Sequence, residues 1–123
     1  MLAVLDGRLR PGSEIVTDAV GLDAALRDAD LVVTGEGRID SQTVNGKTPI
    51  GVARVARRHG KPVIAIGGGL ANDASAVHAH GIAATFSTVM KAGTVAEALA
   101  GARFNLRSAA RNIAAAIKLG MDL

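Results

Sequence analysis

The sequence predicts an α/β fold, a Rossmann-like three-layer arrangement with a parallel sheet between helices. Short apolar runs at 31–35, 62–69 and 82–87 alternate with segments of helical periodicity. The connections are short, as in right-handed βαβ units. Hydrophobic residues make up 49% of the 123 residues but aromatic residues only 2%, so we expect a core of small aliphatic side chains in a single domain.

The first third of the chain is expected to hold the end of a helix, a strand and a second helix. The first residues of "MLAVLDGRL" are apolar and include no Ser, Thr, Asp or Asn that could cap a helix start, so the stretch resembles the tail of a helix. "SEIVTDAV" predicts a short strand around Ile15 and Val16, and "DAALRDA" predicts a helix that ends before Asp30. The continuously apolar "LVVTG" (31–35) then predicts a strand covered on both faces.

The middle of the chain predicts helix, strand and helix. Thr48 and Pro49 form a start signal, with a hydroxyl N-cap followed by proline at the first helical position, and this helix is expected to stop at Gly60. "PVIAIGGG" predicts a buried strand that ends in glycines. "NDASAVHAHG" predicts a helix capped by Asn72 or Asp73.

A strand at 82–87 and one long helix from Thr94 complete the predicted fold. The long helix is predicted because apolar residues recur at steps of three and four, while three arginines lie on its other side. The apolar residues are Val95, Leu99, Ala102, Leu106, Ala109, Ile113 and Ile117.

Composition excludes several classes of function. The chain has no cysteine, which excludes disulfides, thiolate nucleophiles and Cys-ligated zinc. The net charge of +3 favours anionic partners, but stacking aromatic residues are nearly absent, so nucleic acid is not an expected partner. No signal peptide and no membrane-spanning run is recognisable, and we expect a cytoplasmic protein that does not bind membranes.

The charged segment "TGEGRIDSQTVNGKTP" (34–49) directly follows an apolar strand. It matches neither of two phosphate-binding motifs. Ser41 stands where a Walker A loop before Gly46 needs glycine, and Asp40 stands where the dinucleotide fingerprint has its last glycine. A P-loop and a nicotinamide cofactor are therefore not expected.

The same segment carries groups that suit phosphoryl transfer. Glu36 and Asp40 offer carboxylates, Arg38 and Lys47 offer positive charges, and the glycines expose backbone amides. Mg²⁺ prefers oxygen ligands, while cations and amides stabilise a moving phosphoryl group. The alternative is structural: Glu36 and Arg38 pair with neighbours and Asp40 closes an Asx turn.

The stretch "DADLVVTGEGRIDSQTVNGKTPIGVARVARRHGKPVIAIGG" (28–68) resembles the type 1 glycerate kinase family. The resemblance extends to "LRPGSEIVTDAVGLDAAL" before it and to "GIAATFSTV" and "ARNIA" after it. It implies phosphorylation of D-glycerate, with Mg²⁺ as cofactor and ATP as co-substrate. The implied product is 2-phosphoglycerate, with 3-phosphoglycerate also possible.

The resemblance carries the family's site onto eight residues of the segment. By chemistry, we expect a catalytic group of Glu36, Asp40 and Lys47, in which either Asp40 or Glu36 binds Mg²⁺ or accepts the glycerate hydroxyl proton. The expected substrate- or phosphate-binding residues are Gly35, Gly37, Arg38, Gln42 and Gly46.

Members of the resembled family have two α/β domains, and residues 1–123 resemble only the C-terminal part. We therefore expect an incomplete portion of a two-domain kinase, a truncated form that could associate with itself or pair with a missing N-terminal portion. The alternative is a non-catalytic fragment that binds a ligand or a partner.

Overall fold

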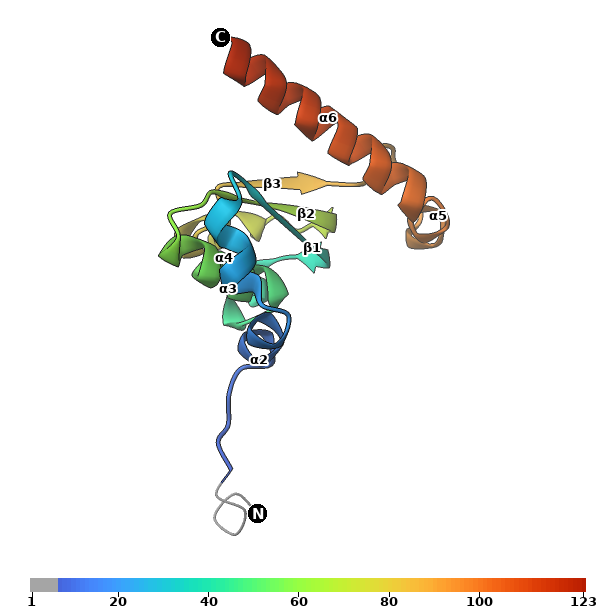
Figure 1. Ribbon diagram of the computed structural model, residues 1–123. Helices are drawn as coiled ribbons and strands as arrows, with labels where there is room; N and C mark the ends of the chain where they lie inside the picture. Colours follow the sequence, from blue (N-terminus) through green and yellow to red (C-terminus); the bar gives the residue numbers. More distant parts are fainter. Residues whose placement is uncertain (1–6) are drawn as a thin grey trace.

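The computed structural model describes residues 7–123 and confirms the predicted α/β class. Its sheet is formed by β1 (Val32–Ile39), β2 (Val63–Leu70) and β3 (Ala84–Ser87). The three strands are parallel in the order β1-β2-β3, so β2 is central (Figure 1). The carboxyl ends of β1 and β2 therefore lie side by side, at the end of the sheet where the charged segment 34–49 leaves β1.

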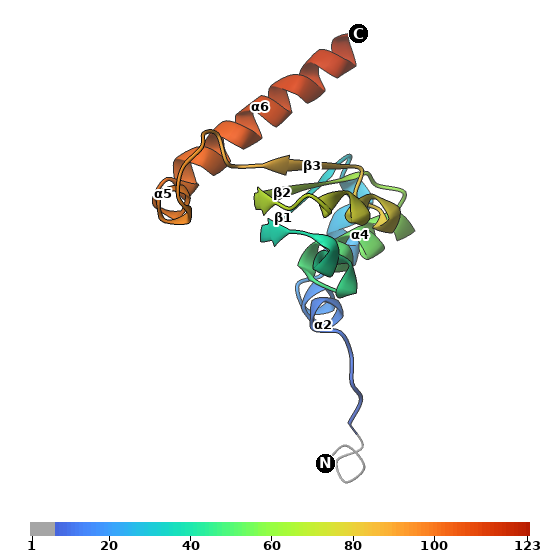
Figure 2. The same ribbon diagram turned by 180° about the vertical axis from the view of Figure 1, so that it is seen from behind.

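Helices cover both faces of the sheet but do so unequally. In both opposite views α2, α3 and α4 lie on one side of the sheet and α6 on the other (Figures 1 and 2). Within residues 7–123, none of the helices combines the length and apolar character needed to cross a bilayer. The helical elements are α2 (Gly12–Ala19), α3 (Leu22–Ala25), η1 (Leu26–Asp28), η2 (Ser41–Asn45), α4 (Thr48–Arg58), η3 (Ala74–His80), α5 (Val95–Ala100) and α6 (Ala102–Asp122).

The alternation of side chains along β2 divides the core into a larger and a smaller cluster. Val63 and Ala65 face the larger cluster, which α4 contributes to with Ala53 and Ala56. Ile64 and the neighbouring Ile66 face the smaller cluster, where α6 contributes Ile113. One face of the sheet is thus well packed, whereas a single long helix partly covers the other.

The predicted strand around Ile15 and Val16 is wrong, because these residues belong to helix α2. Pro11 precedes the helix, and Arg10, which lies before Pro11, donates hydrogen bonds to Glu14 and Asp18 on it. Glu14 and Asp18 are four residues apart and therefore lie on one side of α2, where both can contact Arg10. The predicted helix tail at residues 1–9 lies mostly outside the described part of the chain, and residues 7–9 are not helical.

Strand β1 is longer than the sequence predicts and continues through Ile39. Glu36 and Arg38 therefore lie on a strand and not in a loop. The predicted cap at Thr48 is also wrong: Thr48 is already helical and Lys47 is the N-cap, without a side-chain cap hydrogen bond.

The other elements lie where the sequence predicts them, with changes at their ends. The helix predicted at 23–29 is α3 followed by the 3₁₀ turn η1, and the one before Gly81 is the 3₁₀ helix η3. Asp73 stands at the N-terminus of η3 but its side chain makes no cap hydrogen bond, so the predicted cap is wrong. The long C-terminal helix is divided at Gly101 into α5 and α6.

Strands β1 and β2 approach closely where both are rich in glycine. A Cβ atom added at Gly68 would lie 2.6 Å from the carbonyl oxygen of Gly37, whereas one added at Gly69 would have no atom within 4 Å. We therefore expect Gly68→Ala to lower the free energy of unfolding by about 1–3 kcal/mol, as overpacking does. Gly69→Ala in the same strand is the matched control. Equal urea midpoints for the two variants would contradict the described strand spacing.

Candidate functional site

A large cleft lies at the carboxyl ends of β1 and β2. Its volume is about 1570 Å³, and the segment from Thr88 through α5 to the start of α6 forms its other wall. Figure 1 shows the arrowheads of β1 and β2 directed toward α5. Four of the predicted site residues line this cleft, namely Gly35, Glu36, Gly37 and Arg38. A smaller hollow of about 320 Å³ beside Arg57 and Lys61 is lined by none of them.

Glu36 has a carboxylate oxygen without a hydrogen-bond partner in the described part of the chain. Oε2 is shielded from solvent and accepts no hydrogen bond from the described residues. A shielded polar atom without a hydrogen bond is costly, and such an atom in a native fold calls for an explanation such as an absent ion or ligand. The Glu36 oxygen can bind a cation or accept a proton.

Asp40, in contrast, is held by its neighbours. Its Oδ1 accepts a hydrogen bond of 3.0 Å from the backbone N–H of Gln42, and its own N–H donates to Thr43 Oγ1 over 3.1 Å. These bonds form the N-terminal cap of η2. The structural alternative, in which Asp40 stabilises a turn, is therefore confirmed for its local contacts.

Two cationic side chains, those of Arg38 and Lys47, lie beside the carboxylate of Asp40. Arg38 Nε lies 3.4 Å from Asp40 Oδ2, and Lys47 Nζ lies 3.9 Å from Asp40 Oδ1. Both cationic side chains are well exposed, so these pairs contribute little to stability. Their positive charge stays accessible to an anion at the same end of the sheet.

Gln42 and Gly46 have local structural roles that account for their residue types. Gln42 accepts a hydrogen bond of 3.0 Å at Oε1 from the side chain of Asn45. Gly46 ends η2 with φ of 93°, in the left-handed region that favours glycine. Neither residue lines the cleft.

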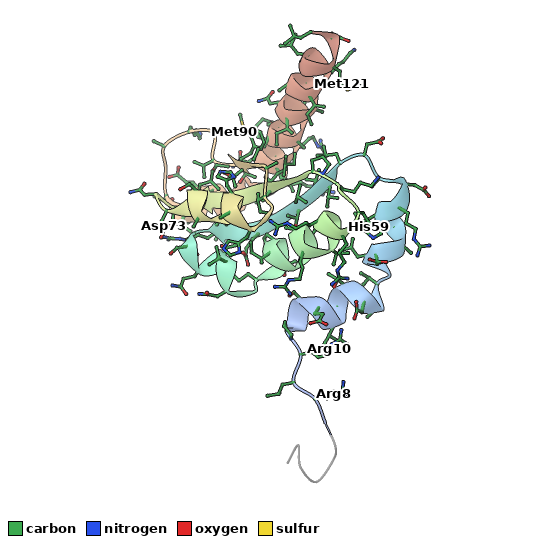
Figure 3. All side chains as sticks on the ribbon, turned by 90° about the vertical axis from the view of Figure 1, so that its left-hand side faces the viewer. Arg8, Arg10, His59, Asp73, Met90 and Met121 are labelled. Atoms are coloured by element: carbon green, nitrogen blue, oxygen red, sulfur yellow. The ribbon has the colours of Figure 1, made fainter. Side chains whose placement is uncertain are left out.

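Asp73 is a member of this region that sequence analysis did not include among the site residues. A hydrogen bond from Ser41 lowers the pKa of Asp73 below its ordinary value, and the positive charge of Arg38 lowers that pKa further. Figure 3 shows Asp73 and His59 on opposite sides of the view, as expected for residues after the carboxyl end and before the amino end of β2. Adjacent parallel strands bring their following loops together, and this was the signal available in "GGGLAND".

Comparison with known proteins identifies the family. The sequence profile of the glycerate kinase family matches residues 1–118. This chain belongs to the glycerate kinase family. The glycerate 2-kinase of Escherichia coli (strain K12) is 51% identical over 121 residues, which are 98% of this chain but 32% of that protein.

Two further glycerate kinases show the same partial coverage. The glycerate kinase of Bacillus subtilis (strain 168) is 50% identical over 123 residues, which are 100% of this chain and 32% of that protein. The crystal structure of a putative glycerate kinase 2 from Salmonella typhimurium LT2 matches with a TM-score of 0.71 and 53% identity, over 94% of this chain and 29% of that one. The chain thus spans about a third of the length of these glycerate kinases.

The carboxylates of this chain differ in how well they suit a magnesium ion. In residues 7–123, no three side chains of the metal-binding types lie together. Mg²⁺ bound with substrate phosphates needs only one or two protein carboxylates. Glu36 suits this role because Oε2 lacks a hydrogen-bond partner among the described residues, while both oxygens of Asp40 already face other groups.

The Asp73 carboxylate gives this site a pH-dependent contribution to stability. Because the pKa of Asp73 is lower in the folded chain than in the unfolded chain, its ionised form stabilises the fold above the unfolded pKa of about 3.9. That stabilisation is lost as the pH falls through the lower folded pKa. We expect Asp73→Asn to reduce the urea midpoint at about pH 7, with the difference shrinking below about pH 4.

The control for this prediction is Asp30→Asn, because the exposed Asp30 makes no salt bridge with the described residues. A difference between wild type and Asp73→Asn that stays constant from neutral to acid pH would contradict the prediction.

Proposed function

We propose that residues 1–123 form the C-terminal part of a glycerate kinase and supply one wall of its active site. The reaction proposed for the whole enzyme is phosphorylation of D-glycerate by ATP, giving a phosphoglycerate, with 2-phosphoglycerate favoured and 3-phosphoglycerate possible. Membership of the glycerate kinase family supports this proposal. The observation that carries it is the unpartnered carboxylate oxygen of Glu36 in a cleft beside Arg38.

The described geometry supports distinct roles for the two carboxylates. Glu36 is the catalytic carboxylate, because Oε2 can accept the proton of the attacking hydroxyl or bind Mg²⁺. Mg²⁺, when bound, would neutralise negative charge on the phosphates. Asp40 acts as a positioning residue, because its carboxylate lies between Arg38 and Lys47 and keeps η2 attached to β1.

The cations and glycines bind the anionic parts of the substrates in this proposal. Arg38 and Lys47 would contact phosphate or the glycerate carboxylate, since both charges remain exposed. Gly35 and Gly37 line the cleft without side chains that would keep a ligand away from the backbone. Each group thereby acts on charge that is present at, or develops near, the transferred phosphoryl group.

A second candidate function is that of a non-catalytic ligand-binding portion. It is favoured by the coverage of about a third of the related kinases, since the rest of their length offers further site residues. The two candidates differ in a single measurement. Both predict that MgATP or D-glycerate raises the melting temperature of the chain, but only a complete kinase site produces ADP in the presence of D-glycerate.

The test uses residues 1–123 mixed with the part of the Bacillus subtilis glycerate kinase that they do not match. We expect glycerate-dependent ADP formation in the mixture, and a loss on the order of 100-fold or more in kcat for Glu36→Gln, because a general base contributes about that factor. Glu14→Gln on α2, where Glu14 pairs with Arg10, is the control. A Glu36→Gln variant with unchanged kcat would remove Glu36 from the mechanism.

Glu36→Gln also has an expected effect that does not depend on activity. Because Oε2 is shielded and has no hydrogen-bond partner within residues 7–123, replacing the carboxylate with a neutral amide removes the cost of a buried charge. We expect the melting temperature of the ligand-free chain to rise and its increase with MgATP to become smaller. Calorimetry with and without MgATP checks both effects, and a lower ligand-free melting temperature would mean that Glu36 supports the fold instead.

A further inference from the structure

A second hollow, which we call the basic hollow, lies at the amino end of β2. Its volume is about 320 Å³, and its lining residues are Arg57, Gly60, Lys61, Pro62 and Gly81. They come from the last turn of α4, the turn that leads into β2 and the residue after η3. Pro62 immediately precedes β2, whereas Gly68 and Gly69 near its other end line the cleft. The two hollows therefore lie at opposite ends of one strand, which Figure 3 marks by His59 and Asp73.

The charges that line the basic hollow are all positive. Among the described residues, Arg57 and Lys61 line it and no carboxylate does. The stretch "RVARRHGK" (54–61) contains three arginines, a lysine and a histidine but no acidic residue. The carboxylate of Asp23 contacts this stretch at His59 Nε2, over 2.9 Å, and pairs with neither cation of the hollow. The basic hollow thus presents two positive charges to solvent without a negative charge to balance them.

The side chains of Arg57 and Lys61 keep their capacity to donate hydrogen bonds. Within residues 7–123, neither forms a salt bridge and neither donates a side-chain hydrogen bond. The simple explanation is that cations at the carboxyl end of a helix interact favourably with its dipole. This explains why positive charge follows α4, but it does not explain why two cations line the same hollow.

The backbone around the hollow is already hydrogen-bonded. Gly60, with φ of 63°, donates its N–H to the carbonyl of Arg57 over 3.1 Å, and the N–H of Lys61 donates to Ala56 over 3.0 Å. This pair of bonds ends a helix at a left-handed glycine. The N–H of Gly81 donates to His78 over 3.4 Å. A ligand in the hollow would therefore be recognised by side chains, not by backbone amides.

The guanidinium of Arg57 lies against Gly81. A Cβ atom added at Gly81 would be 3.3 Å from one terminal nitrogen of Arg57 and 3.6 Å from its Nε. Gly81 also has φ of 96°, in the left-handed region that favours glycine. The contact joins the end of α4 to the end of η3 and places the guanidinium at the wall of the hollow. A side chain that is already placed loses less conformational freedom when a ligand binds.

We propose that the basic hollow binds the phosphate group of a small phosphorylated metabolite. A doubly charged phosphate matches two cations from different segments, because arginine donates paired N–H bonds to phosphate oxygens and lysine adds a compact positive charge. The volume is at the lower end of the range for small-molecule sites, so the hollow suits one small ester. Its glycines leave room for the carbon chain of that ester. The proposal does not depend on the proposed kinase function.

A titration of the ¹⁵N-labelled chain with inorganic phosphate and, separately, with glycerol 3-phosphate tests the proposal. At constant ionic strength, the amide resonances of Gly60, Lys61 and Gly81 should shift and reach saturation with both compounds. Glycerol 3-phosphate should bind at least as tightly as inorganic phosphate, because the hollow has room for its carbon chain. Sodium chloride should give no saturable shift at these amides.

Variants of the lining residues show whether the two cations are responsible. Arg57→Gln and Lys61→Gln should each raise Kd about tenfold, since each removes a charge-assisted contact. Arg54→Gln is the matched control, because Arg54 is exposed on the same helix and does not line the hollow. It should change Kd less than about twofold, since exposed charges outside the site are screened by salt. Equal urea midpoints would verify that the three variants are equally folded.

Three outcomes would overturn the proposal. One is a set of shifts that rises linearly with both compounds, and another is an equal rise in Kd for Arg54→Gln and Arg57→Gln, which would mean unspecific attraction to positive charge. The third is saturable shifts confined to the cleft at Gly35 and Gly37. Saturable binding in the hollow, together with no glycerate-dependent ADP formation in the mixture described above, would contradict the proposed kinase function alone.

Discussion

The close approach of β1 and β2 is the constraint on which the rest of this structure depends. Glycines allow it: added Cβ atoms at Gly35 and Gly68 would lie 3.0 Å and 2.6 Å from carbonyl oxygens of the neighbouring strand. The pairing continues to Ile39 and Leu70, beyond the apolar runs of both strands. It therefore keeps a glycine-rich, charged segment in extended form at the edge of the cleft.

This extension gives two nearby carboxylates different surroundings. Glu36 lies within the strand, where a long side chain cannot reach the local backbone donors that a turn exposes, and its Oε2 lacks a partner among the described residues. Asp40 stands at the strand end, where its short side chain caps η2. Glu36, inside the strand, is therefore the candidate catalytic carboxylate, and Asp40, at the strand end, is the candidate positioning residue.

Sequence patterns located the three strands and the helix α4 because continuous apolar runs and a Thr-Pro start signal are local. They failed at Ile15 and Val16, where two adjacent apolar residues fit a short strand and an exposed helix equally well. They also ended β1 too early, since glycine and charged residues disfavour strands and only pairing with β2 keeps them extended.

The residues of the site were only partly predictable, because some of its contacts join residues that are distant in sequence. The charged residues 34–49 were recognisable, but the contact between Ser41 and Asp73 joins segments that are distant in sequence. The periodicity of the last helix was correct in kind, yet most of its apolar residues are exposed. Periodicity predicts which side of a helix is apolar and does not say which part of the protein covers it.

The central claim is that the carboxyl ends of β1 and β2 bind the substrates of a glycerate kinase. The most direct test is to titrate the ¹⁵N-labelled chain with MgATP and D-glycerate and to follow the amide resonances of its glycines. The account predicts shifts at Gly35, Gly37 and Gly69, which line the cleft. Gly12 and Gly120 should not move, because they do not line it. Shifts confined to Gly60 and Gly81, in the hollow beside Arg57, would contradict the account.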